Sequence, residues 1–157
     1  MSELKVAIVG LDTSHSVELP RLTTDDAKPG MRVDGLKMVS CLRFETPFQN
    51  KEGLDKRQEQ LEKWGINVTE SLDECVADCD AIMIEINDPT YHLEYFKQVA
   101  ELGKPIFLDK PFAADLAESR EIIELARKNN IRMWSGSSLP FTPTIKTALD
   151  NLNAEVM

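Results

Sequence analysis

Residues able to transfer protons or bind anions follow several short apolar runs of this sequence. The chain has two histidines, His15 and His92, and each lies a few residues beyond such a run. A third run ends at the adjacent pair Asp109 and Lys110. Imidazole, carboxylate and ammonium groups can accept, donate or stabilise charge in a reaction when a fold brings them together. The elements that position these side chains therefore decide what they can do.

Short apolar runs alternate with amphipathic stretches along the chain. Residues 5–10, Lys-Val-Ala-Ile-Val-Gly, form a continuous apolar run typical of a strand buried on both faces. Further strands are expected over residues 37–44, 66–69, 80–86, 105–108 and 131–135. Amphipathic segments separate them. The pattern predicts an α/β fold, a Rossmann-like doubly wound parallel sheet of about six strands with helices on both faces.

Capping residues indicate where the helices begin and end. Ser14 and Ser16 can cap a helix that runs to about Thr23, in which Pro20 is tolerable only near the first turn. After a loop over 45–53, further helices are expected over residues 54–64, 91–102, 115–130 and 144–153, and a brief one is expected to open at residues 71–74. Gly65 is expected to follow the end of the second helix, and Ser71 and Asp115 to cap later ones.

Ligands of such sheets bind at the carboxyl ends of the strands, where the strand order reverses. In a Rossmann arrangement this point lies between the first and fourth strands, so the loops after these strands and the fifth should form a crevice. The candidate residues of this crevice are Gly10, Asp12, Thr13, Ser14, His15, Asn87, Pro89, His92, Asp109 and Lys110. Two imidazoles and the Asp12 carboxylate would also suit a transition metal. Because the sequence does not show that these three converge, we predict no metal site.

The composition excludes several classes of partner. The formal charge is −9, from 27 acidic and 18 basic residues, and the basic clusters are interleaved with acidic ones. Such a surface repels nucleic acid and anionic membranes, and we expect neither as a partner. No signal peptide or membrane-spanning helix is expected. Cys41, Cys75 and Cys79 fit buried, reduced thiols, which indicates a cytoplasmic protein.

The order of these motifs resembles the Gfo/Idh/MocA family of NAD(P)-dependent oxidoreductases over the whole chain. Residues 103–112, Gly-Lys-Pro-Ile-Phe-Leu-Asp-Lys-Pro-Phe, are similar to the family's Glu-Lys-Pro signature, with Asp109 in place of Glu. Residues 87–92, Asn-Asp-Pro-Thr-Tyr-His, are similar to the family's loop after the fourth strand, where a proline and a following histidine are typical.

The resemblance implies hydride transfer between NAD or NADP and a hydroxyl or carbonyl carbon, often of a sugar or polyol. The family's signature lysine matches Lys110, which would lie near the nicotinamide and the substrate and assist catalysis. Its ammonium could stabilise charge on a substrate oxygen, or pass a proton if desolvation lowered its pKa. A simple surface ion pair with Asp109 is the alternative. Pro111 would stiffen the loop that aims the lysine.

Two positions depart from the family's cofactor site. The fingerprint Gly-x-Gly-x-x-Gly is replaced by residues 10–15, Gly-Leu-Asp-Thr-Ser-His, so Asp12 would direct a carboxylate toward the site of two phosphates. Hydroxyls at a helix N-terminus could still hold an anion there. After the second strand, Arg43 stands where an acidic residue usually holds the ribose. It would suit the 2′-phosphate of NADP, or could pair with Glu45.

The resemblance also implies a second domain. Residues 1–143 correspond to the NAD(P)-binding domain, and residues 144–157 to the crossover helix and the start of a substrate and dimerisation domain. We therefore expect a truncated chain that is inactive alone, taken from a homo-oligomeric enzyme with a sugar-like substrate. The alternative is a non-catalytic relative that binds a small ligand or acts as a sensor and has lost the dinucleotide fingerprint.

Overall fold

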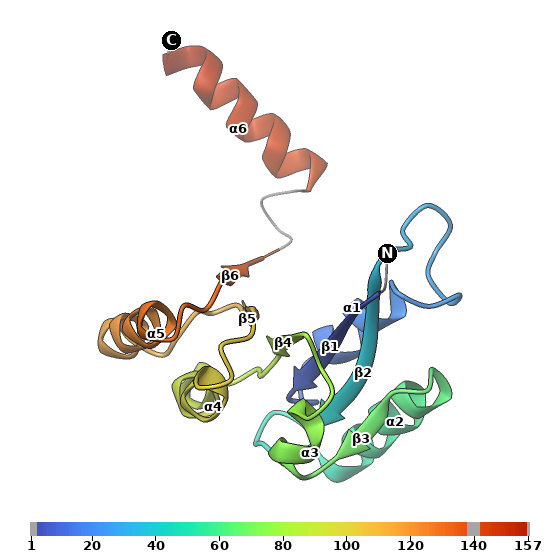
Figure 1. The fold of residues 1–157 in the computed structure, drawn as a ribbon. Coiled ribbons are helices and arrows are strands. Elements are labelled where there is room, and N and C mark those ends of the chain that lie inside the picture. Colours follow the sequence, from blue (N-terminus) through green and yellow to red (C-terminus); the bar gives the residue numbers. More distant parts are fainter. Residues whose placement is uncertain (1–2, 138–141, 157) are drawn as a thin grey trace.

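The fold is built on one six-stranded parallel sheet, as the alternating pattern predicts (Figure 1). A computed structural model describes residues 3–137 and 142–156. The strands are β1 (Leu4–Val9), β2 (Leu36–Leu42), β3 (Asn67–Thr69), β4 (Ala81–Ile84), β5 (Ile106–Asp109) and β6 (Met133–Gly136). Their order is β3-β2-β1-β4-β5-β6, and every neighbouring pair is parallel. This is the Rossmann order, with its reversal between β1 and β4.

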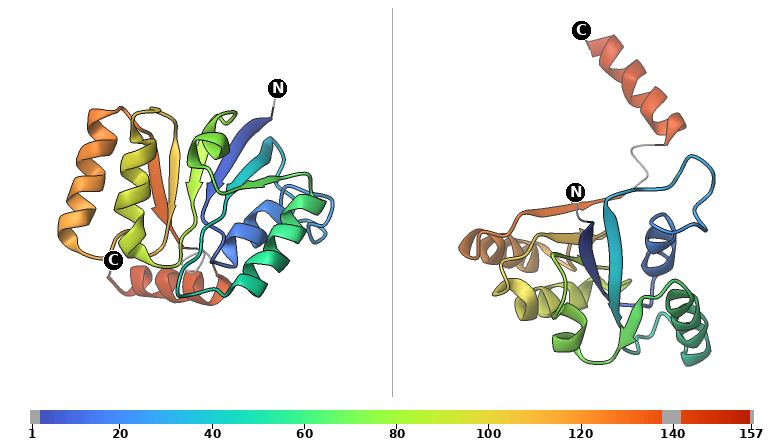
Figure 2. Two further views of the ribbon diagram at one scale, coloured as in Figure 1. Left: turned by 90° about the horizontal axis from the view of Figure 1, so that it is seen from below. Right: turned by 45° about the vertical axis from the view of Figure 1, so that its right-hand side comes forward.

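Helices cover both faces of the sheet (Figure 2). They are α1 (His15–Arg21), α2 (Lys51–Lys63), α3 (Leu72–Val76), η1 (Pro89–Tyr91), α4 (His92–Ala100), α5 (Leu116–Lys128) and α6 (Pro143–Val156). Two buried clusters form the core, one of them under α2 and the other under α3, α4 and α5. Along β1, Val6 and Ile8 enter the first cluster, whereas Ala7 and Val9 enter the second. Burial on both faces therefore explains the continuous apolar run.

Capping explains most helix boundaries. The Ser71 and Asp115 side chains accept hydrogen bonds from the backbone N–H groups of Glu74 and Glu118, as predicted. Gly65 follows α2 with a φ of +76°, a conformation that favours glycine. The sequence prediction was wrong at the start of α2, because Asn50 caps the helix and places residues 51–53, expected as loop, in its first turn.

Pro20 also departs from the expectation. It lies in the last turn of α1 and is buried, rather than near the first turn. A proline there lacks the N–H that would bond to the carbonyl of Ser16, and the helix ends one residue later, at Arg21. The helix is therefore shorter than predicted.

Helix α6 stands apart from the sheet (Figures 1 and 2). One face of the sheet is covered by α1 and α2 over β1 and β2. Over β4, β5 and β6 the same face forms an apolar groove, in which the Trp134 side chain packs against Phe107 and remains 62% exposed.

All three cysteines are free and buried, as predicted. Within the described part of the chain, no helix is both long and apolar enough to cross a membrane.

The turn after β1 depends on glycine at position 10. Gly10 has a φ of +107°, and a Cβ atom there would lie 2.5 Å from the Glu85 carbonyl oxygen. We expect Gly10→Ala to destabilise the fold by more than about 2 kcal/mol in urea unfolding, because strain and a backbone clash add. Gly30→Ala is the control, since Gly30 has a φ of +77° with no atom within 4 Å of a Cβ. Equal losses in the two variants would contradict the clash.

Candidate cofactor and active site

The structure places the predicted site residues along the carboxyl edge of the sheet. The turn between β1 and α1 contains five of them: Gly10, Asp12, Thr13, Ser14 and His15, the last of which begins α1. Asn87, Pro89 and His92 follow β4, Asp109 ends β5 and precedes Lys110, and Arg43 follows β2. These strands are neighbours in the sheet, so the loops converge where the strand order reverses.

Asp12 ties three of these loops together. The side chain is buried, with Oδ1 accepting a hydrogen bond from the Asn87 backbone N–H (3.0 Å) and Oδ2 one from the Thr46 hydroxyl (2.8 Å). Arg57 of α2 donates to the Leu11 carbonyl (2.8 Å), close enough to attract the Asp12 charge. The expectation of a carboxylate directed at a phosphate site therefore needs correction: both oxygens have partners within the protein, and a guanidinium lies beside them.

The start of α1 is stabilised by the Thr13 side chain and not, as expected, by a capping hydrogen bond to the Ser14 side chain. The Thr13 hydroxyl accepts a hydrogen bond from the His15 backbone N–H (3.2 Å). Ser14 is the N-cap residue, but its side chain makes no capping hydrogen bond and is exposed. Its hydroxyl is thus available at the helix end that faces the crevice.

His15, Asp109 and Lys110 form one polar cluster. His15 Nδ1 lies 2.8 Å from Asp109 Oδ2, and Lys110 Nζ donates to the same oxygen at 3.2 Å. Asp109 is buried, whereas the side chain of Lys110 is 43% exposed. A buried carboxylate thus holds an imidazole and an ammonium at the rim of the crevice.

Glu85 is the residue that sequence reasoning missed. It follows β4 directly, is 1% exposed, and has an Oε2 atom 3.9 Å from His15 Nδ1. Neither of its carboxylate oxygens has a hydrogen-bond partner among the described residues. Burial, together with the charge of Asp109, raises the pKa of Glu85 to about 9. An acidic residue within the otherwise apolar residues 81–86 was the available signal.

His92 is not part of this cluster. Its ring is fully buried, with Nε2 2.9 Å from the Ile86 carbonyl oxygen and Nδ1 3.3 Å from that of Phe112. His92 joins the loop after β4 to the loop after β5, so it positions the segment that carries Lys110.

Arg43 has partners other than the expected Glu45. Its guanidinium donates to Asp55 (2.6 Å) and to Gln58, both on α2. Arg43 and Asp55, with Glu45, Lys51 and Glu70, border an open cleft of about 560 Å³ beyond the carboxyl ends of β2 and β3. The arginine is thus fixed at the part of the edge where a Rossmann domain holds the adenosine half of a dinucleotide.

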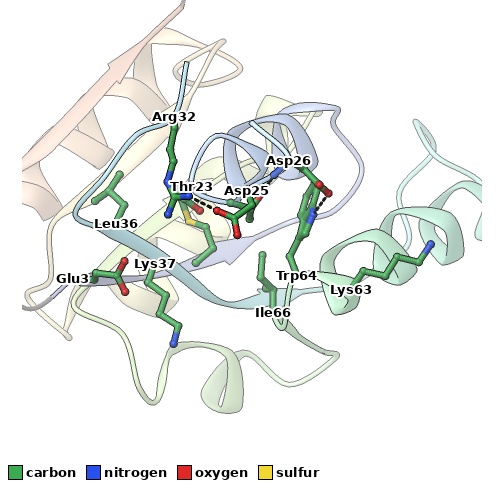
Figure 3. A pocket seen from close by; sticks show the side chains of 12 residues that line it. Glu3, Thr23, Asp25, Asp26, Arg32, Leu36, Lys37, Lys63, Trp64 and Ile66 are labelled. Carbon is green, nitrogen blue, oxygen red and sulfur yellow. Dashed lines mark hydrogen bonds and ion pairs between the residues drawn. The ribbon is translucent and has the colours of Figure 1, made fainter. Parts of the chain in front are cut away.

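A second cleft, of about 390 Å³, lies at the amino ends of β1 and β2 (Figure 3). Several of its polar groups are paired: Arg32 contacts Asp25 and Asp34, and Trp64 Nε1 donates to Asp26 (2.7 Å). None of the predicted site residues borders it. The carboxyl edge therefore remains the candidate site.

Fold and edge together define an NAD-binding Rossmann domain. Residues 4–137 match the model of the Gfo/Idh/MocA family, described as an oxidoreductase family with an NAD-binding Rossmann fold. The chain belongs to this family. The resemblance inferred from residues 103–112 and 87–92 is thereby confirmed.

Several relatives of the chain are named as oxidoreductases or dehydrogenases. The chain is similar to an uncharacterized oxidoreductase of Streptococcus pneumoniae, with 27% identity over 66% of this chain and 28% of that protein. It is also similar to the myo-inositol dehydrogenase Hyg17 of Streptomyces leeuwenhoekii, with 32% identity over 48% of this chain and 23% of that protein. The chain thus spans less than a third of the length of these relatives.

A solved structure shares the fold. An oxidoreductase from Agrobacterium radiobacter, crystallised with NAD⁺, L-tartaric acid and magnesium, superposes with a TM-score of 0.75 at 18% identity. The match covers 98% of this chain and 41% of that one. At this identity the likeness establishes the fold alone.

The raised pKa of Glu85 predicts that stability falls as the pH rises. The unfolded chain releases this proton near pH 4.5, whereas the folded protein keeps it up to about pH 9. Between these values Glu85 costs stability, by up to about 1 kcal/mol per pH unit. Glu85→Gln removes this cost, so we expect the variant to be more stable than the wild type at pH 8 and similar to it at pH 4.5.

The measurement is urea unfolding with a metal chelator present. Glu59→Gln, at an exposed position of α2, is the matched control and should leave the pH dependence unchanged. A variant Glu85→Gln with the same pH dependence as the wild type would show that Glu85 is ionised in the folded protein.

Proposed function

We propose that this domain binds NAD or NADP across the crevice between β1 and β4, and that the whole protein transfers hydride to or from a sugar, a polyol or a related hydroxy compound. The observation that carries the proposal is Lys110, held by Asp109 at the carboxyl end of β5 beside the strand-order reversal. The myo-inositol dehydrogenase among the relatives supports a polyol as substrate.

The residues present fit a dinucleotide. Gly10 keeps the turn after β1 tight against β4. The Asp12 carboxylate is hydrogen-bonded within the protein and has Arg57 beside it, which reduces its repulsion of phosphates. The Ser14 hydroxyl and Arg57 would hold the pyrophosphate, and Arg43 the ribose or its 2′-phosphate. A nicotinamide ring, when bound, supplies the acceptor or donor of hydride.

Lys110 has the position required of a catalytic ammonium. Its Nζ lies at the rim, 43% exposed, and the buried Asp109 carboxylate restrains it from one side. In the direction of reduction, the ammonium would hydrogen-bond the substrate carbonyl oxygen and stabilise the negative charge that develops there as hydride is added to the carbon. It would also donate the proton that completes the hydroxyl group. His15, bonded to the same carboxylate, would fix the position of Asp109.

Family membership supports further proposals about the remaining residues and partners of the whole protein. We propose that Asn87, Pro89 and His92 shape the nicotinamide side of the crevice, that residues 1–143 work with a second, substrate-binding domain, and that the enzyme is a cytoplasmic homo-oligomer. The share of the relatives that this chain spans supports the second domain.

A non-catalytic ligand-binding role is the second candidate. The observation that favours it is that Asp12 and His15 occupy two fingerprint glycine positions and have internal partners. Thermal-shift assays with sugars and sugar acids, beside fluorescence titration with NADH and NADPH, separate the two. Saturable binding of either dinucleotide supports the oxidoreductase, and stabilisation by a sugar acid without dinucleotide binding supports the second role.

Lys110→Ala should abolish turnover but leave folding intact. In the full-length protein, with myo-inositol and other polyols as substrates, we expect kcat to fall by at least about 100-fold, because charge stabilisation at the substrate oxygen is lost. Lys97→Ala is the control, since Lys97 pairs with Glu121 on the surface. A rate within twofold of the wild type would remove Lys110 from the mechanism.

Asp12→Asn should tighten dinucleotide binding. An asparagine keeps the size of the side chain and can bond both Asn87 and Thr46, but it removes the negative charge. We expect the Kd for NADH or NADPH to fall by at least about fivefold at low salt. Asp12→Gly would also remove two buried hydrogen bonds and cost about 1–3 kcal/mol each in stability.

Fluorescence titration at two salt concentrations measures this effect. Asp73→Asn, at an exposed position of α3, is the matched control. An unaltered Kd for Asp12→Asn would mean that the Asp12 charge does not limit binding.

A further inference from the structure

A nitrogen and two carboxylates converge between α1, β4 and β5. His15 Nδ1 lies 2.8 Å from Asp109 Oδ2 and 3.9 Å from Glu85 Oε2, and one ligand atom from each of the three residues lies within 4.8 Å of the others. We propose that His15, Glu85 and Asp109 bind a divalent transition-metal ion. This site differs from the combination of Asp12, His15 and His92 weighed from the sequence, because both nitrogens of His92 face backbone carbonyls.

The spacing suits metal coordination. Zinc lies about 2.0–2.2 Å from imidazole nitrogen and carboxylate oxygen, so ligand atoms at angles of 90–110° are roughly 3–3.5 Å apart. The distances of 2.8 and 3.9 Å bracket this range. Small rotations of the His15 and Glu85 side chains would place all three atoms around one ion without movement of the strands.

Glu85 is the independent observation that points to a ligand. Its carboxyl group is 1% exposed, and neither oxygen accepts a hydrogen bond from the described residues. Its one polar contact of this kind, with Asp109, needs a proton between the two carboxyl groups. A buried carboxyl group without a partner is costly, and it normally persists only where a proton, a cation or a metal compensates it. Its Oε2 atom faces His15, the side on which the ion would lie.

The donor set selects the kind of ion. Mixed imidazole and carboxylate ligands suit Zn²⁺, Fe²⁺ or Co²⁺, whereas Mg²⁺ prefers oxygen ligands and waters. Two carboxylates and a neutral imidazole balance a divalent charge. The ammonium of Lys110 is the competing cation, but its side chain is 43% exposed and can turn away from Asp109.

The ion would keep open coordination positions. The His15 side chain is 32% exposed, so the cluster is accessible from the crevice. With only three protein ligands, the ion could bind a substrate oxygen beside Lys110 and polarise it. This last step rests on the proposed function, whereas metal binding itself does not.

Calorimetric titration of the chelator-treated 157-residue chain with Zn²⁺ tests the site. We expect one Zn²⁺ per chain with a Kd tighter than roughly 100 µM, and far weaker binding of Mg²⁺. Co²⁺ should give visible absorption bands of a nitrogen- and oxygen-ligated ion. Because no dinucleotide or substrate is present, the outcome is independent of the proposed oxidoreductase activity.

Single substitutions locate the ion. Glu85→Gln and His15→Ala should each weaken Zn²⁺ binding by at least about tenfold, whereas Asp34→Asn, in the exposed Arg32 ion pair, should not. His15 is partly exposed, so its variant keeps the test valid if Glu85→Gln does not fold. Absence of saturable Zn²⁺ binding, or equal Kd values for the wild type and both variants, would overturn the proposal and leave a protonated Glu85.

Discussion

The carboxyl ends of β4 and β5 bring two acidic side chains into one buried space. Neighbouring strands of a parallel sheet end at the same edge, so Glu85 and Asp109, which follow the paired residues Ile84 and Leu108, lie next to each other. Two buried carboxylates repel, so their charge must be offset: His15 and Lys110 contact Asp109, and the raised pKa of Glu85 favours its protonated form. The position of Lys110 at the rim depends on this balance.

The two residues that replace fingerprint glycines, Asp12 and His15, make contacts that join the loops at the carboxyl edge of the sheet. His15 takes the place of the third glycine and reaches across the turn to Asp109, which a glycine could not do. Asp12 takes the place of the second and joins the loops after β1, β2 and β4 through Thr46 and Asn87. Contacts that other Rossmann domains make through backbone and ligand are here partly made by the protein's own side chains.

The sequence predicted the sheet because each strand and cap has a local signal, as the apolar run at β1 and the caps at Ser71 and Asp115 show. The site was less predictable because its contacts join residues far apart in the chain. Nothing local indicates that Arg57 bonds Leu11, or that Arg43 prefers Asp55 to the nearer Glu45. Both partners depend on where α2 lies against the sheet, which local patterns do not encode.

The proposed metal site lies on one half of the edge that a dinucleotide would span. The loops after β1 and β2 contain Asp12, Arg43 and Thr46, and they lie on the side of the edge where the adenosine half of a dinucleotide would bind. Glu85, Asp109 and Lys110 end or follow β4 and β5, on the nicotinamide side. A metal ion bound by His15 would lie next to the start of α1, where Ser14 would contact the pyrophosphate. It would add positive charge near the substrate oxygen, where Lys110 alone would otherwise supply it.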